Sequence, residues 1–161
     1  MTIDARMSLS IENERGQESC IARIIDPTET DVMFVLNRYQ RHKFELLIHI
    51  VPSMPYNRKP WLDFKPMNGP YSFLELLANR GYYRLQARGQ NDHRRSRVLY
   101  DPNFKPVPEG DDPDDYALGG QGVSPNVTDL DLAIRACVEF LRTGDLSDDL
   151  TTISRAHVDK C

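Results

Sequence analysis

A strict alternation of apolar and polar residues at the start of the chain is the feature that most constrains the fold. Apolar side chains occupy every second position, at Ile3, Ala5, Met7, Leu9 and Ile11. Because successive side chains of a strand point to opposite faces, this period of two predicts a strand with one buried face. Residues 19–25 follow a glycine-containing turn and predict a second strand, so the two segments predict a hairpin. The chain must therefore contain a sheet with an apolar face, which needs a covering layer.

Two segments with the helical period can supply that layer. Asp26 followed by Pro27 predicts a helix start with Asp26 as the N-cap. Residues 128–131 are similar to a capping box and predict a second helix, which ends at Gly144. The apolar face of the first helix consists of Val32, Val35, Leu36 and Tyr39, and that of the second consists of Leu130, Ile134, Cys137, Val138 and Leu141, with Phe140 at its edge.

The middle of the chain carries further strand signals. Residues 44–51 are apolar on both faces and predict a central strand. Residues 61–65 are a shorter strand candidate. A second hairpin is predicted from residues 82–88 and 97–100, in which Tyr83, Leu85 and Ala87 share one side.

Between these strands we expect a short third helix from Ser72 through Ala78, ended by Gly81 in the left-handed conformation. The stretch 101–126 contains five prolines and predicts a long loop, a kind of segment that is usually functional or disordered.

The predicted order is β-β-α-β-β-α-β-β-α, which indicates the α+β class. We expect a largely antiparallel sheet of about five to six strands with two or three helices packed on one face. A length of 161 residues fits a single domain over residues 1–161.

The expected compartment is the cytoplasm. The N-terminus lacks the basic start and apolar run of a signal peptide, and no stretch approaches the roughly 18–20 apolar residues that a membrane span needs. Cys20, Cys137 and Cys161 are an odd number of widely spaced cysteines without a CxxC pair, which favours reduced thiols over disulfides or zinc ligands.

No catalytic motif is recognisable. The chain has no GxSxG, and no nucleophile signature surrounds its cysteines. Its histidines are scattered: His42, His49, His93 and His157. His49 lies in the densest apolar strand, where a structural role is the more common one. We therefore expect a protein that is not an enzyme and uses no cofactor or metal.

The two halves of the chain differ in charge. Residues 1–100 carry 15 Lys and Arg against 11 Asp and Glu, whereas residues 101–161 carry 5 against 13. The acid is concentrated in residues 109–115, where Glu109, Asp111, Asp112, Asp114 and Asp115 precede Tyr116. These residues lack the alternation and the terminal Glu of a calcium loop, so they predict a solvated loop rather than a metal site. An acidic loop of this kind can also contact a basic partner.

The opposite signal is a basic stretch between Arg80 and Arg97, interleaved with Tyr82 and Tyr83. Arginine can contact phosphates, and tyrosine can stack on bases. A solvated strand face with a charged turn explains the same pattern. The acidic balance, with a pI near 5.5, argues against nucleic acid as the main partner.

Residues 117–146 carry a resemblance to a known family. They contain Leu-Gly-Gly, a variable segment, and an amphipathic helix ending in Phe-x-x-Thr-Gly, at Leu118, Gly119, Gly120, Phe140, Thr143 and Gly144. This pattern resembles the C-terminal part of bacterial immunity proteins from polymorphic-toxin and contact-dependent inhibition systems, including those that pair with deaminase toxins. Several of these proteins have a Trp soon after the helix, whereas the single Trp here is Trp61.

The resemblance implies an α+β fold and an inhibitor that occludes a cognate toxin domain without catalysis. Toxins that act on nucleic acid present basic clefts, and the candidate contact residues are Glu109, Asp111, Asp112, Asp114, Asp115 and Tyr116. The alternative is a small enzyme or nucleic-acid-binding adaptor that uses the Arg80–Arg97 region.

Overall fold

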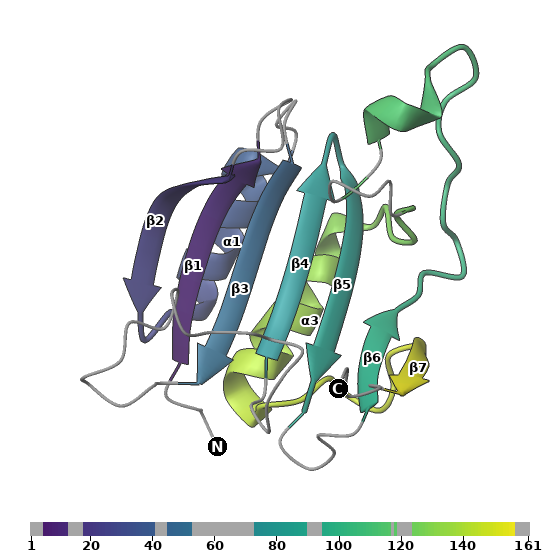
Figure 1. Ribbon diagram of the computed structural model, residues 1–161. Coiled ribbons are helices and arrows are strands. Elements are labelled where there is room, and N and C mark those ends of the chain that lie inside the picture. Colours follow the sequence, from purple (N-terminus) through teal and green to yellow (C-terminus); the bar gives the residue numbers. More distant parts are fainter. Residues whose placement is uncertain are drawn as a thin grey trace, which may run out of the picture.

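Seven strands form one antiparallel sheet in the computed structural model, in the order β2-β1-β3-β4-β5-β6-β7 (Figure 1). The structure describes residues 5–12, 18–40, 45–52, 73–89, 95–116, 118 and 124–156. The strands are β1 Ala5–Glu12, β2 Glu18–Ile25, β3 Glu45–Pro52, β4 Phe73–Asn79, β5 Tyr82–Arg88, β6 Arg95–Leu99 and β7 Thr152–Ala156.

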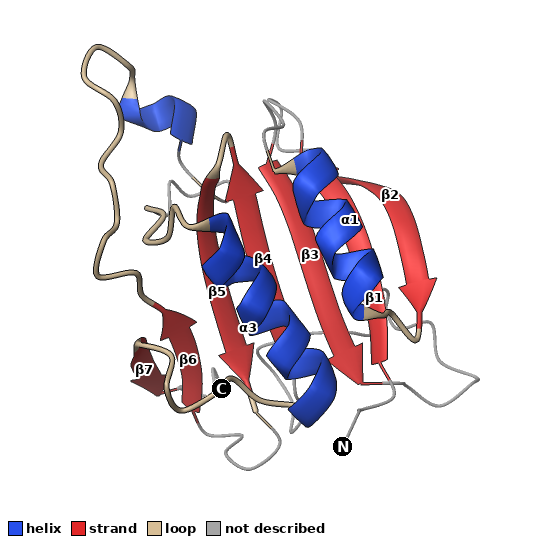
Figure 2. Ribbon diagram, turned by 180° about the vertical axis from the view of Figure 1, so that it is seen from behind, coloured by secondary structure: helices blue, strands red, loops and turns tan. Residues whose placement is uncertain are grey.

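Both α-helices cover the same face of this sheet. Figure 2 shows α1, Glu29–Tyr39, lying over β1 and β3, and α3, Leu130–Thr143, lying over β4 and β5. The α+β class and the antiparallel sheet with helices on one face are confirmed, with seven strands in place of the predicted five to six. In the described part of the chain, no helix is long and apolar enough to cross a membrane.

The core lies between the sheet and the two helices, and both layers contribute buried residues to it. The strand register aligns Ile48, Leu76 and Leu85 in one row across β3, β4 and β5, and all three are buried. Tyr83, Leu85 and Ala87 are buried together, as their alternation predicts. Aliphatic side chains at every second position of a strand form the surface on which an amphipathic helix can pack.

The two amphipathic helices predicted from the sequence exist, but their starts differ from the prediction. The N-cap of α1 is Thr28 rather than Asp26: the Thr28 hydroxyl accepts from the Asp31 N–H at 3.3 Å, and the Asp31 carboxylate accepts from the Thr28 N–H at 2.7 Å. This reciprocal capping box satisfies two backbone donors at the start of the helix. Asp26 instead has a positive φ of 50° in the turn before the helix.

The helix α3 has Asp129 as its N-cap, with its carboxylate accepting from Asp131 N and Leu132 N. Its buried face is rotated from the predicted one and consists of Ala133, Ala136, Cys137, Phe140 and Leu141. Ile134 and Val138 are only partly buried. Gly144 ends the helix, as predicted, and has the left-handed conformation with φ 77°.

The helix predicted over residues 72–78 is wrong, because Phe73–Asn79 forms strand β4. Leucine and alanine favour helices, but here they pair on both sides with β3 and β5, and tertiary pairing overrides local propensity. Gly81 lies in a two-residue turn with Arg80, and both have positive φ, 85° and 54°. Two positive φ values match the twist of an antiparallel hairpin.

The strand β7 was not predicted at all. It pairs with β6 at the edge of the sheet and follows the last helix. The candidate strand at residues 61–65 and the turn around Gly16 lie outside the described residues, whereas the hairpin of β1 and β2 is confirmed.

We expect Phe140→Ala to lower the free energy of unfolding by about 3–5 kcal/mol, because the ring is fully buried beneath α3. Ile134→Ala should cost less, since Ile134 is only partly buried. Urea denaturation measures both. Phe34→Ala on α1 is the matched control, because that ring is exposed, and its unfolding midpoint should stay close to that of the wild type.

Candidate functional site

The acidic residues lie on a long connection that leaves the sheet after β6. In Figure 1 this connection runs beside β5 and curls beyond the end of the sheet before the short helix η1, Pro113–Tyr116. Glu109, Asp111, Asp112, Asp114 and Asp115 are all exposed, and Tyr116 is half-buried. We call residues 109–115 the acidic loop.

A single tyrosine at the start of β5 holds both ends of this connection. The Tyr82 ring packs edge-on against Phe104, with centroids 6.1 Å apart, and against Tyr116, with centroids 4.7 Å apart. Its hydroxyl donates to the Pro106 carbonyl at 3.1 Å. Because Phe104 precedes the acidic loop and Tyr116 follows it, one buried side chain closes the segment at its base.

The turn between β4 and β5 adds a second attachment. The Asn79 side-chain amide donates to the Asp115 carbonyl at 3.0 Å. The Arg80 guanidinium is 3.8 Å from the Asp115 carboxylate and lies over the Tyr116 ring, 5.7 Å from its centroid. The loop is therefore fixed to the hairpin by hydrogen bonding, charge and ring stacking together.

The carboxylates of the acidic loop divide into two groups. Asp111 and Asp115 have partners within the chain, since Asp111 accepts from the Tyr116 hydroxyl and Asp115 pairs with Arg80. Asp112 caps η1, with one oxygen accepting from the Asp114 N–H at 3.0 Å. Within the described part of the chain, no ion pair is formed by Glu109, Asp112 or Asp114, whose charges face solvent.

The hydrogen bond to Asp111 raises the pKa of Tyr116 above that of a free tyrosine, because the carboxylate accepts the hydroxyl proton. The tyrosine therefore stays neutral at physiological pH and keeps donating. Among the described residues, no three His, Cys, Asp or Glu side chains lie close enough together to hold a metal ion. The carboxylates thus spread along the loop instead of converging on one point.

The basic stretch is not gathered into one surface. Arg80 faces the acidic loop, and Arg88 is buried with its guanidinium over the Phe73 ring, 5.4 Å from the centroid. Arg97 points toward the segment after α3, as described next. Arg94 and the side chain of Arg95 lie outside the described residues. Three of these arginines, Arg80, Arg88 and Arg97, therefore contact groups of the same chain.

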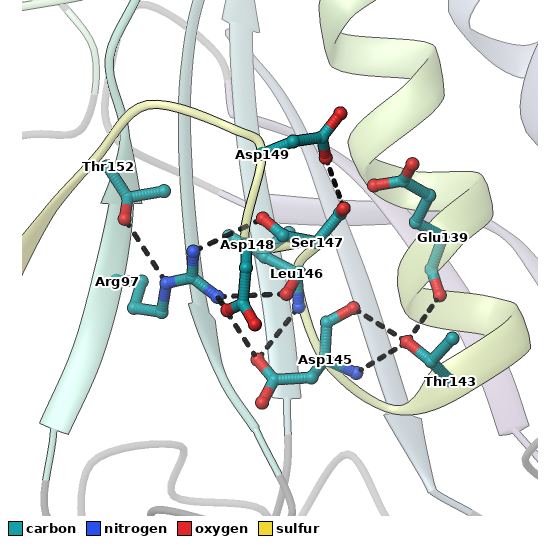
Figure 3. A network of polar contacts seen from close by, with 9 residues as sticks. All are labelled: Arg97, Glu139, Thr143, Asp145, Leu146, Ser147, Asp148, Asp149 and Thr152. Atoms are coloured by element: carbon teal, nitrogen blue, oxygen red, sulfur yellow. Dashed lines mark hydrogen bonds and ion pairs between the residues drawn. The ribbon is translucent and has the colours of Figure 1, made fainter.

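Arg97 is the centre of the polar network drawn in Figure 3. From β6 its guanidinium donates to the carbonyls of Leu146 at 2.8 Å and Ser147 at 3.2 Å and to the Thr152 hydroxyl at 3.1 Å. Carboxylates of Asp145 and Asp148 lie 3.9 and 3.7 Å away. One side chain thus ties the segment after α3 to β6 and to the edge strand β7.

The Phe-x-x-Thr-Gly pattern sets up this segment. Phe140 is buried, Gly144 makes the left-handed stop, and the Thr143 hydroxyl accepts from the Asp145 N–H at 3.2 Å. A Cβ at Gly89 would clash with the Asp145 carboxylate, so the segment packs where the chain after β5 has no side chain. The pattern is therefore structural here. Gly119 and Gly120 lie outside the described residues, and Leu118 is buried.

Among the candidate nucleophiles and bases, the structure describes the side chain of Cys137, which is buried. Burial raises the pKa of Cys137 to about 12, so its thiol stays protonated and unreactive at neutral pH. His49 stands opposite Ser8 and Glu75 in the strand register. His42, His93 and His157 lie outside the described residues, as does the side chain of Cys20.

Comparisons with known proteins return no match: no family model fits the chain, and no curated protein and no solved structure is significantly similar to it.

We expect Arg97→Met to lower the free energy of unfolding by about 1–3 kcal/mol, because half-buried carbonyl groups lose a charged donor. Arg135→Met is the control: Arg135 pairs with Glu139 and Asp149 on an exposed surface, and such pairs contribute about 0–1 kcal/mol. Chemical denaturation of the two variants compares them. Equal losses would show that the Arg97 network does not hold β6 and β7.

We expect Tyr82→Phe to loosen the acidic loop without unfolding the sheet. The ring contacts remain, but the hydrogen bond to Pro106 is lost, at a cost of about 0.5–1.5 kcal/mol. Amide hydrogen exchange should accelerate at Asp111, whose N–H donates to the Pro108 carbonyl. Tyr100→Phe, at an exposed tyrosine before the same segment, should leave that exchange unchanged.

Proposed function

We propose that the protein is a non-catalytic inhibitor, an immunity protein that binds a cognate bacterial toxin domain and occludes it with the acidic loop. The observation that carries the proposal is the set of exposed carboxylates, Glu109, Asp112 and Asp114, on a loop held at both ends by Tyr82. The resemblance of residues 117–146 to immunity proteins supports the same function. The partner surface is a basic cleft of a nucleic-acid-targeting toxin.

Electrostatics explains why such a loop suits a binding role. Like charges repel, so a run of acids in one short loop lowers stability unless a cation compensates it. Arg80 compensates one end of the run, at Asp115. The remaining charges gain their full compensation from basic residues of a partner, and this long-range attraction raises the association rate.

The attachment of the acidic loop to the β4–β5 hairpin favours tight binding. A flexible loop loses conformational entropy when it is immobilised at an interface, whereas a loop already fixed loses less. The contacts of Tyr82, Asn79 and Arg80 provide this fixation before any partner arrives. In Figure 2 the loop also projects past the end of the sheet, where it can enter a concave surface.

The residues named from the sequence take different roles in this proposal. Glu109, Asp112 and Asp114 contact the partner directly. Asp111, Asp115 and Tyr116 hold the loop in shape, because their polar groups already have partners within the chain. Tyr116 then presents only the uncovered part of its ring.

The alternative function, a small enzyme or nucleic-acid adaptor acting through Arg80–Arg97, has weaker support. Arg80, Arg88 and Arg97 are engaged by the acidic loop, by Phe73 and by the segment after α3. A phosphate backbone would have to compete with these contacts. A gel shift with single- and double-stranded nucleic acid tests this alternative directly.

The proposal itself is tested with the protein encoded by the neighbouring gene. The two full-length chains are co-expressed and purified through a tag on one of them. We expect a stable complex and loss of the toxin's activity in proportion to bound inhibitor. A toxin that stays fully active with excess inhibitor, or a nucleic-acid complex formed by the inhibitor alone, would overturn the proposal.

We expect Asp112→Asn with Asp114→Asn to slow association with the toxin at least about tenfold at low salt and to flatten its salt dependence. Asparagine at position 112 keeps the oxygen that caps η1, so the fold should be unchanged. Stopped-flow association across a salt series is the measurement. Asp26→Asn with Asp131→Asn removes equal charge at exposed positions outside the loop, and equal slowing by this control would mean that the loop itself is not the contact.

A further inference from the structure

The helix α1 exposes large apolar side chains on the face opposite the core. Phe34 is 58% exposed and the adjacent Met33 is 48% exposed. Four large hydrophobic residues of the described chain are exposed, and these two are neighbours on one helix. Single exposed apolar residues are common, but an adjacent pair on one helix sets this face apart from the rest of the described surface.

The outward face of α3 differs from that of α1 in its apolar exposure and in the pairing of its charges. It has no exposed large hydrophobic residue, and its outward arginines have partners: Arg135 pairs with Glu139 and Asp149, and Arg142 pairs with Glu29. The outer face of α1 is therefore the apolar surface of the helical layer.

Opposite charges lie on one side of Phe34. Asp31 is three residues before it and Arg38 is four residues after it. With 3.6 residues per turn, these positions lie about 60° and about 40° around the helix from Phe34, in the same direction. The Arg38 guanidinium lies over the rings of Phe34 and Tyr39, 5.8 and 5.7 Å from their centroids. The acid and the base thus flank the exposed ring at nearly equal spacing along the helix.

Both charges can accept a further partner. The Asp31 carboxylate accepts from the Thr28 N–H and the Thr28 hydroxyl, and both bonds use its Oδ2. In the described part of the chain, neither Asp31 nor Arg38 forms an ion pair. The capping bonds hold the carboxylate in one place and leave its second oxygen for a guanidinium from outside.

The other side of Phe34 carries uncharged polar residues. Thr30 lies four residues before it and Asn37 three residues after it, and both are exposed. They lie about 40° and about 60° around the helix in the direction opposite to the charges. The Asn37 amide donates to the Met33 carbonyl at 2.8 Å. The face therefore consists of a central ring with a charged side and an uncharged polar side.

This arrangement is self-complementary under a two-fold rotation. We infer that α1 binds α1 of a second copy of the chain in an antiparallel pair, with Phe34 at the two-fold axis. The rotation reverses the helix direction and sets each side of the face against the same side of the other copy. Each contact between one residue of the first copy and another residue of the second then occurs twice, with the copies exchanged, as a two-fold interface requires.

The pairing brings opposite charges together twice. Each Asp31 faces the Arg38 of the other copy, and each Thr30 faces the other Asn37. The difference between three and four residues is a mismatch of about 1.5 Å along the helix axis, which the long arginine side chain spans. Two ion pairs therefore flank the contact between the Phe34 rings.

The dimer is weak and sensitive to salt. An eleven-residue helix is about 16 Å long, and a contact of this size buries less than a standard interface. Exposed ion pairs contribute modestly and are screened by salt. The acidic loop takes no part in the contact, so dimerisation and toxin binding can be tested separately.

Sedimentation equilibrium of the full chain tests the inference at low salt, from roughly 10 µM to about 1 mM, the range of a weak small interface. We expect the wild type to dimerise as concentration rises. Phe34→Ala removes the central contact, and Arg38→Glu sets carboxylates against carboxylates. Each variant should dimerise at least about tenfold more weakly than the wild type.

A charge exchange between two variants provides the decisive measurement. Asp31→Arg sets guanidinium groups against guanidinium groups, so this variant alone should also associate weakly. In a mixed dimer of Asp31→Arg with Arg38→Glu, one copy supplies two bases and the other two acids. Both ion pairs form again, and association of the mixture should return to the wild-type level.

Two controls separate the charge effect from damage to the helix. Asp31→Arg loses the carboxylate half of the capping box, whereas the Thr28 hydroxyl still accepts from the N–H of residue 31, and circular dichroism confirms that the helices remain. Asp131→Arg in the first turn of α3 and Lys105→Glu make the same charge changes at exposed positions outside α1. These two variants should dimerise like the wild type.

Three results would overturn the inference. They are a wild type that stays monomeric over the whole range, single variants that associate as strongly as the wild type, and a mixture that associates no better than either variant alone.

Discussion

The packing of two amphipathic helices on one face of the sheet is the interaction on which the rest of the structure depends. Rows such as Ile48, Leu76 and Leu85 become a continuous apolar surface only when β3, β4 and β5 are in register. The helices remove this surface from water, and burial of apolar area is the dominant favourable contribution to folding. The acidic loop and the Arg97 network are attached to the margins of this layer, where backbone groups still need partners.

The turn between β4 and β5 links these margins to the acidic loop. Tyr83 points to the helices, where its hydroxyl donates to Gln40 at the end of α1, at 2.7 Å. The neighbouring Tyr82 side chain points to the other side of the strand, where its ring packs against Phe104 and Tyr116. Adjacent residues of a strand face opposite ways, so two consecutive tyrosines connect the core to the candidate site through a single rigid strand.

Sequence patterns predicted the elements with a clear period and missed those decided by contact. The alternation at Tyr83 to Ala87 and both long helices were confirmed, because burial on one face leaves a visible period. The helix predicted at residues 72–78 was wrong, because leucines flanked by pairing strands look helical in isolation. For the candidate site, the sequence predicted the acidic residues but not the roles of Tyr82 and Asn79. Those roles could not be predicted because the hydrogen-bond partners lie 24 and 36 residues away in the sequence. The paired tyrosines beside Gly81 were the available signal.

The network around Arg97 has a consequence for how the chain folds as it is synthesised. The carbonyl and hydroxyl groups that its guanidinium binds lie 49 to 55 residues later in the sequence. While the ribosome is still adding those residues, a cation at the growing edge of the sheet has no native partner, and β7 does not yet close that edge. The hairpin of β4 and β5, the acidic loop and α3 are therefore made first. The edge strand pair becomes native last, when the segment after α3 supplies its carbonyls.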